Sequence, residues 1–463
     1  MITTSMRRSA TAVATMMLAL LVASTLGLGE SAAAAKIKRV RNIAPGALDS
    51  DPSKFAIFKG KAYFIADAQD GDGPSLWRSD GTKAGTKKFV NTNPVGPDSV
   101  GDLHVHRDRL YFSAADGAKG IELWRTNGRK AGTKRVRDIN PGSPDAKPTH
   151  FTSYGGRLYF VATTDKEGAE LWRSDGTKKG TRLVRDVWFG QIGSSPSDLV
   201  VVDGKLFFAA QDATAGRELW KTKGTKSSTR RVRDIRPDAA GSGPSNLTRV
   251  GKRLFFFAND GVTGMEPWKS DGSEAGTKRI MDIRTGPVGS PDDGRPGVYR
   301  GEFYFAAQKA NVSMELWKSD GSKVGTKRVN KLNESGMPTS PSSFQAYKGK
   351  LYFSARDSDG DRELWRTNGS RAGTSRFKNL YKFSHGGPTA FVIADGKLFF
   401  TALNKQGREL WQTNGKRAGT RQVKDINPGP PEASIRWATR WGKRLIFRAT
   451  DVSKGAELWI RKP

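Results

Sequence analysis

Short apolar runs broken by turn residues recur along almost the whole chain. In one stretch they occupy residues 151–154, 157–163, 169–174 and 181–187, and Gly-Gly and Asp-Gly pairs separate them. Such pairs supply the positive φ that tight hairpin turns require. No window shows the 3.6-residue period of an amphipathic helix. The pattern therefore predicts units of four short antiparallel strands and no helices.

These units repeat with a nearly constant period. The motif tryptophans are spaced by 47, 48, 48, 48, 49, 48, 46 and 48 residues, and they are Trp77, Trp124, Trp172, Trp220, Trp268, Trp317, Trp365, Trp411 and Trp459. A four-stranded meander of this period is typical of a propeller blade, and neighbouring blades bury the faces that one meander cannot. We therefore predict an all-β fold, a single β-propeller of about nine blades over residues 36–463. Leu and Trp of each motif should lie between blades.

The two ends of the repeat region predict how the ring closes. The chain stops at 457–463, which reads as a third strand, so the last blade lacks its fourth. Residues 36–46, "KIKRVRNIAPG", match the fourth strand and exit loop "TKRVRDINPG" at 133–142. We expect the N-terminal strand to complete the last blade.

The repeated phrase also carries a resemblance. "ELWRTNGRKAGT" (122–133), "ELWRSDGTKKGT" (170–181) and "ELWKSDGSKVGT" (315–326) resemble the ELWxxDGT repeat family, hyalin-like repeats of secreted bacterial proteins. The resemblance covers residues 36–463 and implies export and a bacterial source. It brings no established catalytic residues, so none is carried over.

Residues 1–35 differ from the rest. A basic pair at Arg7 and Arg8, an apolar run at 10–29 and small residues at 31–35 predict a cleaved signal peptide; a retained membrane anchor is the alternative. The arginine pair leaves general secretory and twin-arginine export open. The chain has no cysteine, which excludes disulfides and thiolate metal sites. We expect a secreted, extracellular or cell-wall-associated monomer.

The chain carries a formal net charge of +32. Turns after first and third strands hold mostly Lys and Arg, whereas turns after second strands hold more Asp and Glu, so we expect one basic and one acidic face. A basic face suits an anionic polymer or cell surface; ordinary solvated hairpin tips are the alternative. The predicted polyanion-binding residues are Arg129, Lys130, Lys134, Arg135, Lys178, Lys179, Arg182, Lys416, Arg417 and Arg421.

Other candidate chemistry is sparse. Trp188 and Trp437 lie outside the repeated motif and are candidates for stacking on a ligand. The turn containing Asp357, Asp359 and Asp361 could hold calcium or be a plain Asp-rich turn, and no other cofactor is expected. His104 and His106 share a strand face but lack an evident third metal ligand, so no metal site is predicted.

The repeated motif Glu recurs too often to be catalytic, and we expect it to pair with a fourth-strand arginine such as Arg137 or Arg185. Together these features predict a secreted, non-catalytic propeller that binds anionic polymers: cell-wall polymer, acidic polysaccharide or extracellular nucleic acid. One alternative is a glycan-active hydrolase or lyase at the propeller channel, near residues 284–297. The other is a protein-interaction or adhesion platform.

Overall fold

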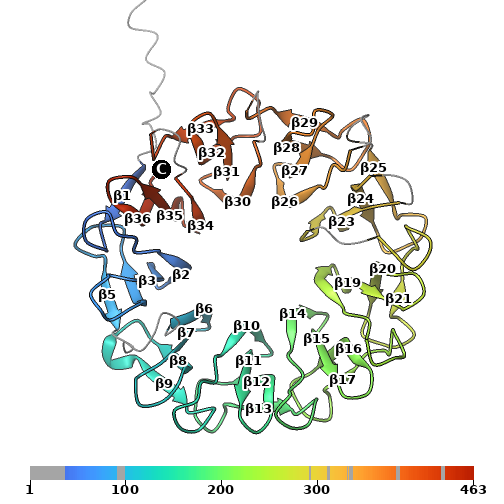
Figure 1. The fold of residues 1–463 in the computed structure, drawn as a ribbon, viewed down its shortest axis with the longest axis horizontal. Helices are drawn as coiled ribbons and strands as arrows, with labels where there is room; N and C mark the ends of the chain where they lie inside the picture. The colour runs from blue at the N-terminus through green and yellow to red at the C-terminus, as the bar shows by residue number, and fades with distance from the viewer. Residues whose placement is uncertain are drawn as a thin grey trace, which may run out of the picture.

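The chain forms a closed ring of nine four-stranded antiparallel sheets (Figure 1). The structure, a computed structural model, describes residues 37–90, 100–290, 294–309, 313–330, 332, 337–381, 386–428 and 433–463. Within these ranges no helix has the length and apolarity to cross a membrane. The predicted nine-bladed propeller is confirmed, whereas the predicted signal peptide at 1–35 lies outside the described residues.

Eight blades use four consecutive strands and the ninth uses the last three strands together with the N-terminal one; the first strand of each blade in this order lies nearest the centre (Figure 1). The strands of the first four blades are β2 (Ser53–Phe58), β3 (Lys61–Ala66), β4 (Ser75–Ser79), β5 (Lys87–Val90), β6 (Val100–His106), β7 (Arg109–Ala114), β8 (Glu122–Thr126), β9 (Lys134–Arg137), β10 (Thr149–Tyr154), β11 (Arg157–Thr164), β12 (Gly168–Ser174), β13 (Arg182–Arg185), β14 (Ser197–Val202), β15 (Lys205–Asp212), β16 (Gly216–Thr222) and β17 (Arg230–Arg231). A 3-10 turn, η1 (Lys130–Gly132), lies between the third and fourth strands of the second blade.

The remaining blades follow the same order. Their strands are β18 (Ser245–Val250), β19 (Arg253–Asn259), β20 (Met265–Ser270), β21 (Lys278–Arg279), β22 (Gly297–Tyr299), β23 (Glu302–Ala307), β24 (Glu315–Ser319), β25 (Lys327–Asn330), β26 (Ser342–Tyr347), β27 (Lys350–Arg356), β28 (Arg362–Thr367), β29 (Ser375–Lys378), β30 (Thr389–Ala394), β31 (Lys397–Asn404), β32 (Gly407–Thr413), β33 (Arg421–Lys424), β34 (Arg436–Trp441), β35 (Arg444–Asp451), β36 (Gly455–Arg461) and, from the other end of the chain, β1 (Ile37–Arg41).

The hydrophobic core lies between blades, as the motif predicts. Tyr111 and Leu123 of the second blade pack against Leu158, Phe160 and Trp172 of the third, and similar clusters fill the other junctions. These side chains are at most 5% exposed. Because each sheet is buried on both faces, its middle strands are apolar at nearly every position. Truncation of one such tryptophan removes about 3–5 kcal/mol of folding free energy.

The motif glutamate is fully buried, but its predicted pairing with a fourth-strand arginine is wrong. The Glu122 carboxylate accepts hydrogen bonds from the backbone N–H groups of Ile139 and Asn140, at 2.7 and 3.1 Å, in the loop after the fourth strand. Glu170 accepts N–H bonds from the equivalent loop and a 2.6 Å bond from the Ser194 hydroxyl. Burial raises the pKa of both carboxyls to about 7, and the N–H bonds act in the opposite direction. The glutamate thus fixes the loop that leads into the next blade.

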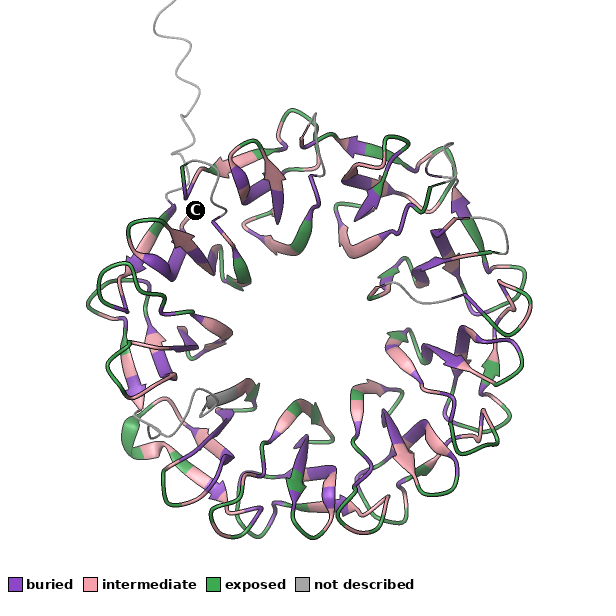
Figure 2. Ribbon diagram, viewed as in Figure 1, coloured by how far each residue is buried: buried purple, intermediate pink, exposed green. Residues whose placement is uncertain are grey.

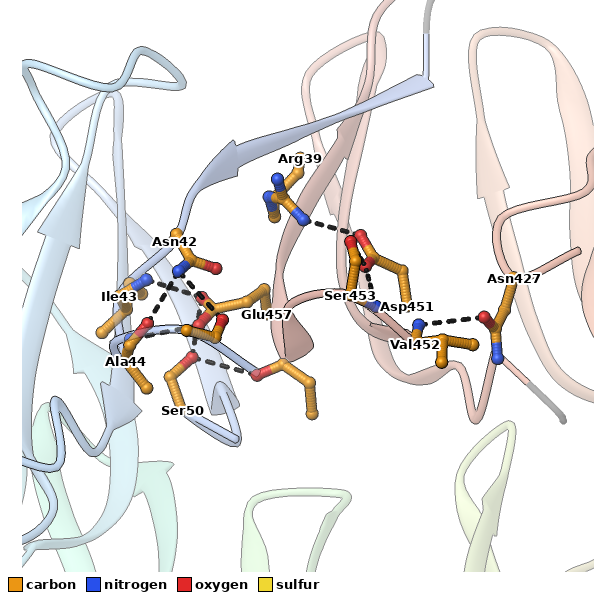
Figure 3. A network of polar contacts seen from close by, with 12 residues as sticks. Arg39, Asn42, Ile43, Ala44, Ser50, Asn427, Asp451, Val452, Ser453 and Glu457 are labelled. Atoms are coloured by element: carbon orange, nitrogen blue, oxygen red, sulfur yellow. Dashed lines mark hydrogen bonds and ion pairs between the residues drawn. The ribbon is translucent and has the colours of Figure 1, made fainter. Parts of the chain in front are cut away.

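The ring closes through β1, as predicted. This strand pairs antiparallel with β36, with Lys38 opposite Ile460 and Arg39 opposite Trp459. Next to this pairing, the Glu457 carboxylate accepts the N–H groups of Ile43 and Ala44 at 2.8 and 3.1 Å (Figure 3). The two ends of the described chain are therefore joined by the same contacts that join consecutive blades elsewhere.

Candidate ligand site at the inner wall of the ring

The innermost strands of the blades form an inner wall around the centre of the ring (Figure 1). Figure 2 shows these strands mostly in the intermediate and exposed colours, whereas the second and third strands are mostly buried. Each innermost strand is the last in its sheet, and none of the described strands pairs with its inner edge. The wall therefore offers side chains and strand edges together.

A bulge recurs at the start of most inner strands. The pairing between first and second strands shifts there, for example between Ser53 and Ala56. The residue within the shift takes a left-handed conformation in seven blades, with φ of 52° at Lys54, 56° at His150, 54° at Asp198, 53° at Asn246, 56° at Ser343, 53° at Ala390 and 58° at Trp437. Asn, Asp and His tolerate this conformation better than other non-glycine residues.

Trp437 is the largest of these seven residues. A bulky aromatic residue at φ of 58° is strained, and its side chain is nevertheless 49% exposed. The conformation itself belongs to the repeated bulge, and the exposed indole is what distinguishes Trp437 from the equivalent residues of the other blades. The predicted stacking residue Trp437 thus lies on the inner wall, on β34.

Trp188, the other predicted stacking residue, lies elsewhere. It is half-buried in the loop after β13, where its backbone N–H donates to Glu170 at 3.1 Å. Its neighbour Phe189 is 89% exposed. The structure therefore separates the two stacking candidates and leaves only Trp437 on the wall.

The wall carries side chains of several kinds. Lys54 and Asp102, from the inner strands of adjacent blades, form an ion pair of 3.3 Å. Asp198, Asn246 and Trp437 add a carboxylate, an amide and an indole in other blades. Unlike the repeated turns, the wall presents a different group at each of these positions.

The basic turns do lie on one face. Side chains of first-to-second-strand turns reach third-to-fourth-strand turns of the next blade: Lys59 donates to the Asn127 carbonyl at 3.0 Å and Lys348 to the Asn414 carbonyl at 3.2 Å. Most of the ten predicted polyanion-binding residues are exposed on these turns. Arg135 differs, because it points to the opposite turn and pairs with Asp116 at 2.6 Å.

Many of the Lys and Arg side chains instead contact the neighbouring blade. Four arginines have the same two contacts with the next blade. The guanidinium lies 5.8–5.9 Å from the centre of the motif Trp ring and donates to a Thr carbonyl at 2.5–2.8 Å; the four are Arg41, Arg137, Arg185 and Arg233. Further inter-blade bonds to turn carbonyls come from Arg78, Lys205, Lys221, Lys269, Arg366 and Arg444. Acidic turns are also occupied, since Asp451, Asp212 and Asp260 pair with the fourth-strand residues Arg39, Arg231 and Arg279.

The Asp-rich turn at 357–361 is held by internal hydrogen bonds. Asp357 is 4% exposed, and its Oδ1 accepts the N–H groups of Asp359 and Asp361 at 3.1 Å. Its Oδ2 accepts from Arg376. Among the described residues no group of three or more His, Asp or Glu could hold a metal ion. Calcium at this turn stays a prediction.

Comparison with known proteins identifies neither a family nor an activity for this chain. No protein-family model matches the chain, and no curated protein matches it in sequence. Similar solved structures are a puromycin hydrolase (12% identity, TM-score 0.43, 89% of this chain and 60% of that chain), a prolyl endopeptidase (13%, 0.45, 90% and 55%) and the β-propeller domain of the Trilobed protease from Pyrococcus furiosus (12%, 0.35, 68% and 94%). The chain thus spans about three fifths of the length of the puromycin hydrolase.

The functional prediction from the sequence is corrected here. The proteins similar in fold are described as peptidases and hydrolases, and none of those named above is described as a binder of anionic polymers, a glycan-active enzyme or an adhesion platform. The physical reason for the correction lies in the basic residues themselves. Much of the net positive charge that suggested a polyanion ligand comes from residues outside the ten predicted ones, such as Arg137 and Arg185, which are bonded to carbonyls and aromatic rings of the next blade, so net charge alone does not identify a ligand.

Proposed function

We propose that this chain is a binding protein that holds an extended polypeptide segment against the inner wall of the ring, with Trp437 as the main contact. The observation that carries the proposal is the half-exposed indole of Trp437 in a left-handed backbone conformation. Aromatic side chains at binding surfaces bury a large area at a low cost in conformational entropy.

The mixed chemistry of the wall supports a polypeptide as the ligand. A polymer of identical charged units would meet Lys54 in one blade, Asp198 in another and Trp437 in a third, and could not use them all. A polypeptide carries side chains of both charges, amides and aromatic rings. It can therefore match a wall in which the equivalent positions differ.

The strand edges support an extended conformation of that polypeptide. Each of the nine sheets turns the edge of its first strand toward the centre. Such an edge has backbone N–H and C=O groups that can bond an added strand, and this is a recurrent way of binding peptides. Because bulges disturb the first half of most inner strands, the bonds should form mainly beside the regular halves near the first turn.

Fluorescence anisotropy with labelled twelve-residue peptides tests the proposal. One peptide series contains Tyr and Trp and a matched series replaces them with Ser; a labelled poly-aspartate of the same length is the polyanion control. The native chain should bind the aromatic series at least roughly tenfold more tightly than the Ser series. Trp437→Ala should weaken that binding roughly tenfold, and Trp188→Ala should leave it unchanged.

Two outcomes would overturn the proposal. One is the absence of measurable binding by any peptide of the aromatic series. The other is equal binding by the native chain and Trp437→Ala, because the indole is then not the main contact. Near-ultraviolet circular dichroism of each variant verifies that the ring is intact.

A further inference from the structure

Two histidines and a serine meet at the junction of the second and third blades. His104 and His106 lie two residues apart on β6, and Ser153 lies on the neighbouring inner strand β10. The Ser153 Oγ is 2.9 Å from His104 Nε2 and also 2.9 Å from His106 Nδ1. Two imidazole nitrogens therefore converge on one point.

The same position in other blades explains how His106 is held. Tyr154, Tyr299 and Tyr347 occupy it there, and each donates its hydroxyl to a turn carbonyl of the next blade, those of Gly204, Gly349 and Gly396, at 2.5–2.7 Å. His106 replaces this tyrosine, and its Nε2 faces the equivalent Gly156 carbonyl at 3.4 Å. A carbonyl accepts only from a protonated nitrogen, so we assign the hydrogen to Nε2 and a free lone pair to Nδ1.

We propose that His104 Nε2 and His106 Nδ1 are ligands of a transition-metal ion, with Cu²⁺ as the preferred ion. Histidines that ligate metals almost always donate their other ring N–H to a carbonyl or carboxylate, as His106 does here. Two imidazole nitrogens in adjacent positions of a tetragonal Cu²⁺ ion, each about 2.0 Å from the ion, lie about 2.8 Å apart. Both nitrogens already face the Ser153 hydroxyl, so rotation of the two rings can bring them onto one ion, and solvent or the Ser153 hydroxyl can complete the coordination.

The residues around the two histidines indicate which kind of ion the site prefers. The two histidines and the serine include no carboxylate, and Asp102, the acidic residue nearest along the strand, pairs with Lys54. Hard ions such as Mg²⁺ and Ca²⁺ prefer carboxylate and carbonyl oxygens and are therefore disfavoured. Imidazole nitrogens suit Cu²⁺, Ni²⁺ and Zn²⁺, and the affinity order among divalent ions places Cu²⁺ first.

Replacements taken from other blades separate metal binding from folding. His106→Tyr restores the side chain of three other blades and keeps a donor for the Gly156 carbonyl. His104→Thr introduces the residue that β10 has at this position, Thr152. The control is His150→Asn, which changes an exposed histidine to the residue that β18 has there, Asn246.

Isothermal titration of the untagged full chain with CuCl₂ and ZnCl₂ in a non-chelating buffer tests the site. The native chain and His150→Asn should bind one Cu²⁺ per chain more tightly than Zn²⁺. His104→Thr and His106→Tyr should each weaken Cu²⁺ binding roughly tenfold or more. Electron paramagnetic resonance should show two coordinated imidazole nitrogens in the native chain and one in either single variant.

Three results would overturn the inference. These are a native Cu²⁺ dissociation constant weaker than about 0.1 mM, unchanged binding in a variant that combines His104→Thr with His106→Tyr, and loss of binding in His150→Asn alone. Peptide binding at Trp437, on another blade, does not require this site. The two proposals can therefore fail separately.

Discussion

Replacement of Arg185 by methionine tests whether the excess basic charge stabilises the ring. The Arg185 guanidinium lies 5.9 Å from the centre of the Trp220 ring of the next blade, and its Nη1 donates to the Thr229 carbonyl at 2.5 Å. Methionine keeps an apolar stem over the indole but has neither charge nor donor. A hydrogen bond from a charged group contributes about 1.5–3 kcal/mol, and a cation–π contact contributes about 0.5–1 kcal/mol. Together we expect a loss of about 2–4 kcal/mol.

Urea unfolding followed by tryptophan fluorescence measures this loss, with hydrogen exchange to localise it to the junction of the third and fourth blades. Arg185→Lys is the matched variant, because Lys424 occupies the equivalent position above Trp459 at 5.6 Å. It should retain the cation–π part and lose less stability than methionine. The reasoning is refuted if Arg185→Met unfolds within about 0.5 kcal/mol of the native chain, the range of an ordinary surface substitution.

Three further predictions concern the turns, the buried glutamates and the closure. Gly176→Ala should lower the free energy of unfolding in urea by about 2 kcal/mol or more, because φ is +90° and an added Cβ would lie 2.5 Å from the Tyr111 hydroxyl. Gly155→Ala is the matched control: φ is +53° and no atom lies within 4 Å of an added Cβ, so the loss should be about 1 kcal/mol. Burial raises the pKa of Glu170 to about 7, above its unfolded value, so the contribution of this group to stability is complete at low pH and is lost as pH rises through 7. The urea midpoint of the native chain should therefore fall between pH 5 and 8, and it should fall less steeply in Glu170→Gln. A native midpoint that does not change with pH would contradict this. Val40→Asp should raise hydrogen exchange in β36 because Val40 is 6% exposed in the closing junction, whereas Lys38→Asp on the exposed side of β1 should not.

The sequence predicted most of the fold because the repeat encodes it directly. Asp-Gly and Asn-Gly pairs marked the turns, apolar runs marked the buried middle strands, and the match between 36–46 and 133–142 predicted the closing strand. The turn pairs and the apolar runs are local signals that recur in most of the nine units, so a fault in one copy is outweighed by the others.

The site could not be predicted to the same extent, for a physical reason. Glu122 accepts its hydrogen bonds from backbone N–H groups, which almost every residue has. The residue types therefore do not reveal that Arg137 donates to the next blade instead. Likewise, the sequence around Lys59 is typical of a solvated turn, and only the structure shows that its ammonium group donates to the Asn127 carbonyl of the next blade. The convergence of His104 and His106 on Ser153 depends on contact between two blades. One signal was available: a histidine stands where other blades have Tyr154 or Tyr347.

The pairing of β1 with β36 has a consequence for how the molecule is made. During synthesis, each blade can pack on the one before it as soon as its four strands have left the ribosome, but Glu457 meets Ile43 and Ala44 across a separation of 414 and 413 residues. Until then, β1 is a solitary strand and the ring is an open arc with a bare sheet at each end. Such an arc can accept β1 from a second copy as readily as its own. The yield of single closed rings should therefore fall as the concentration of refolding chains rises.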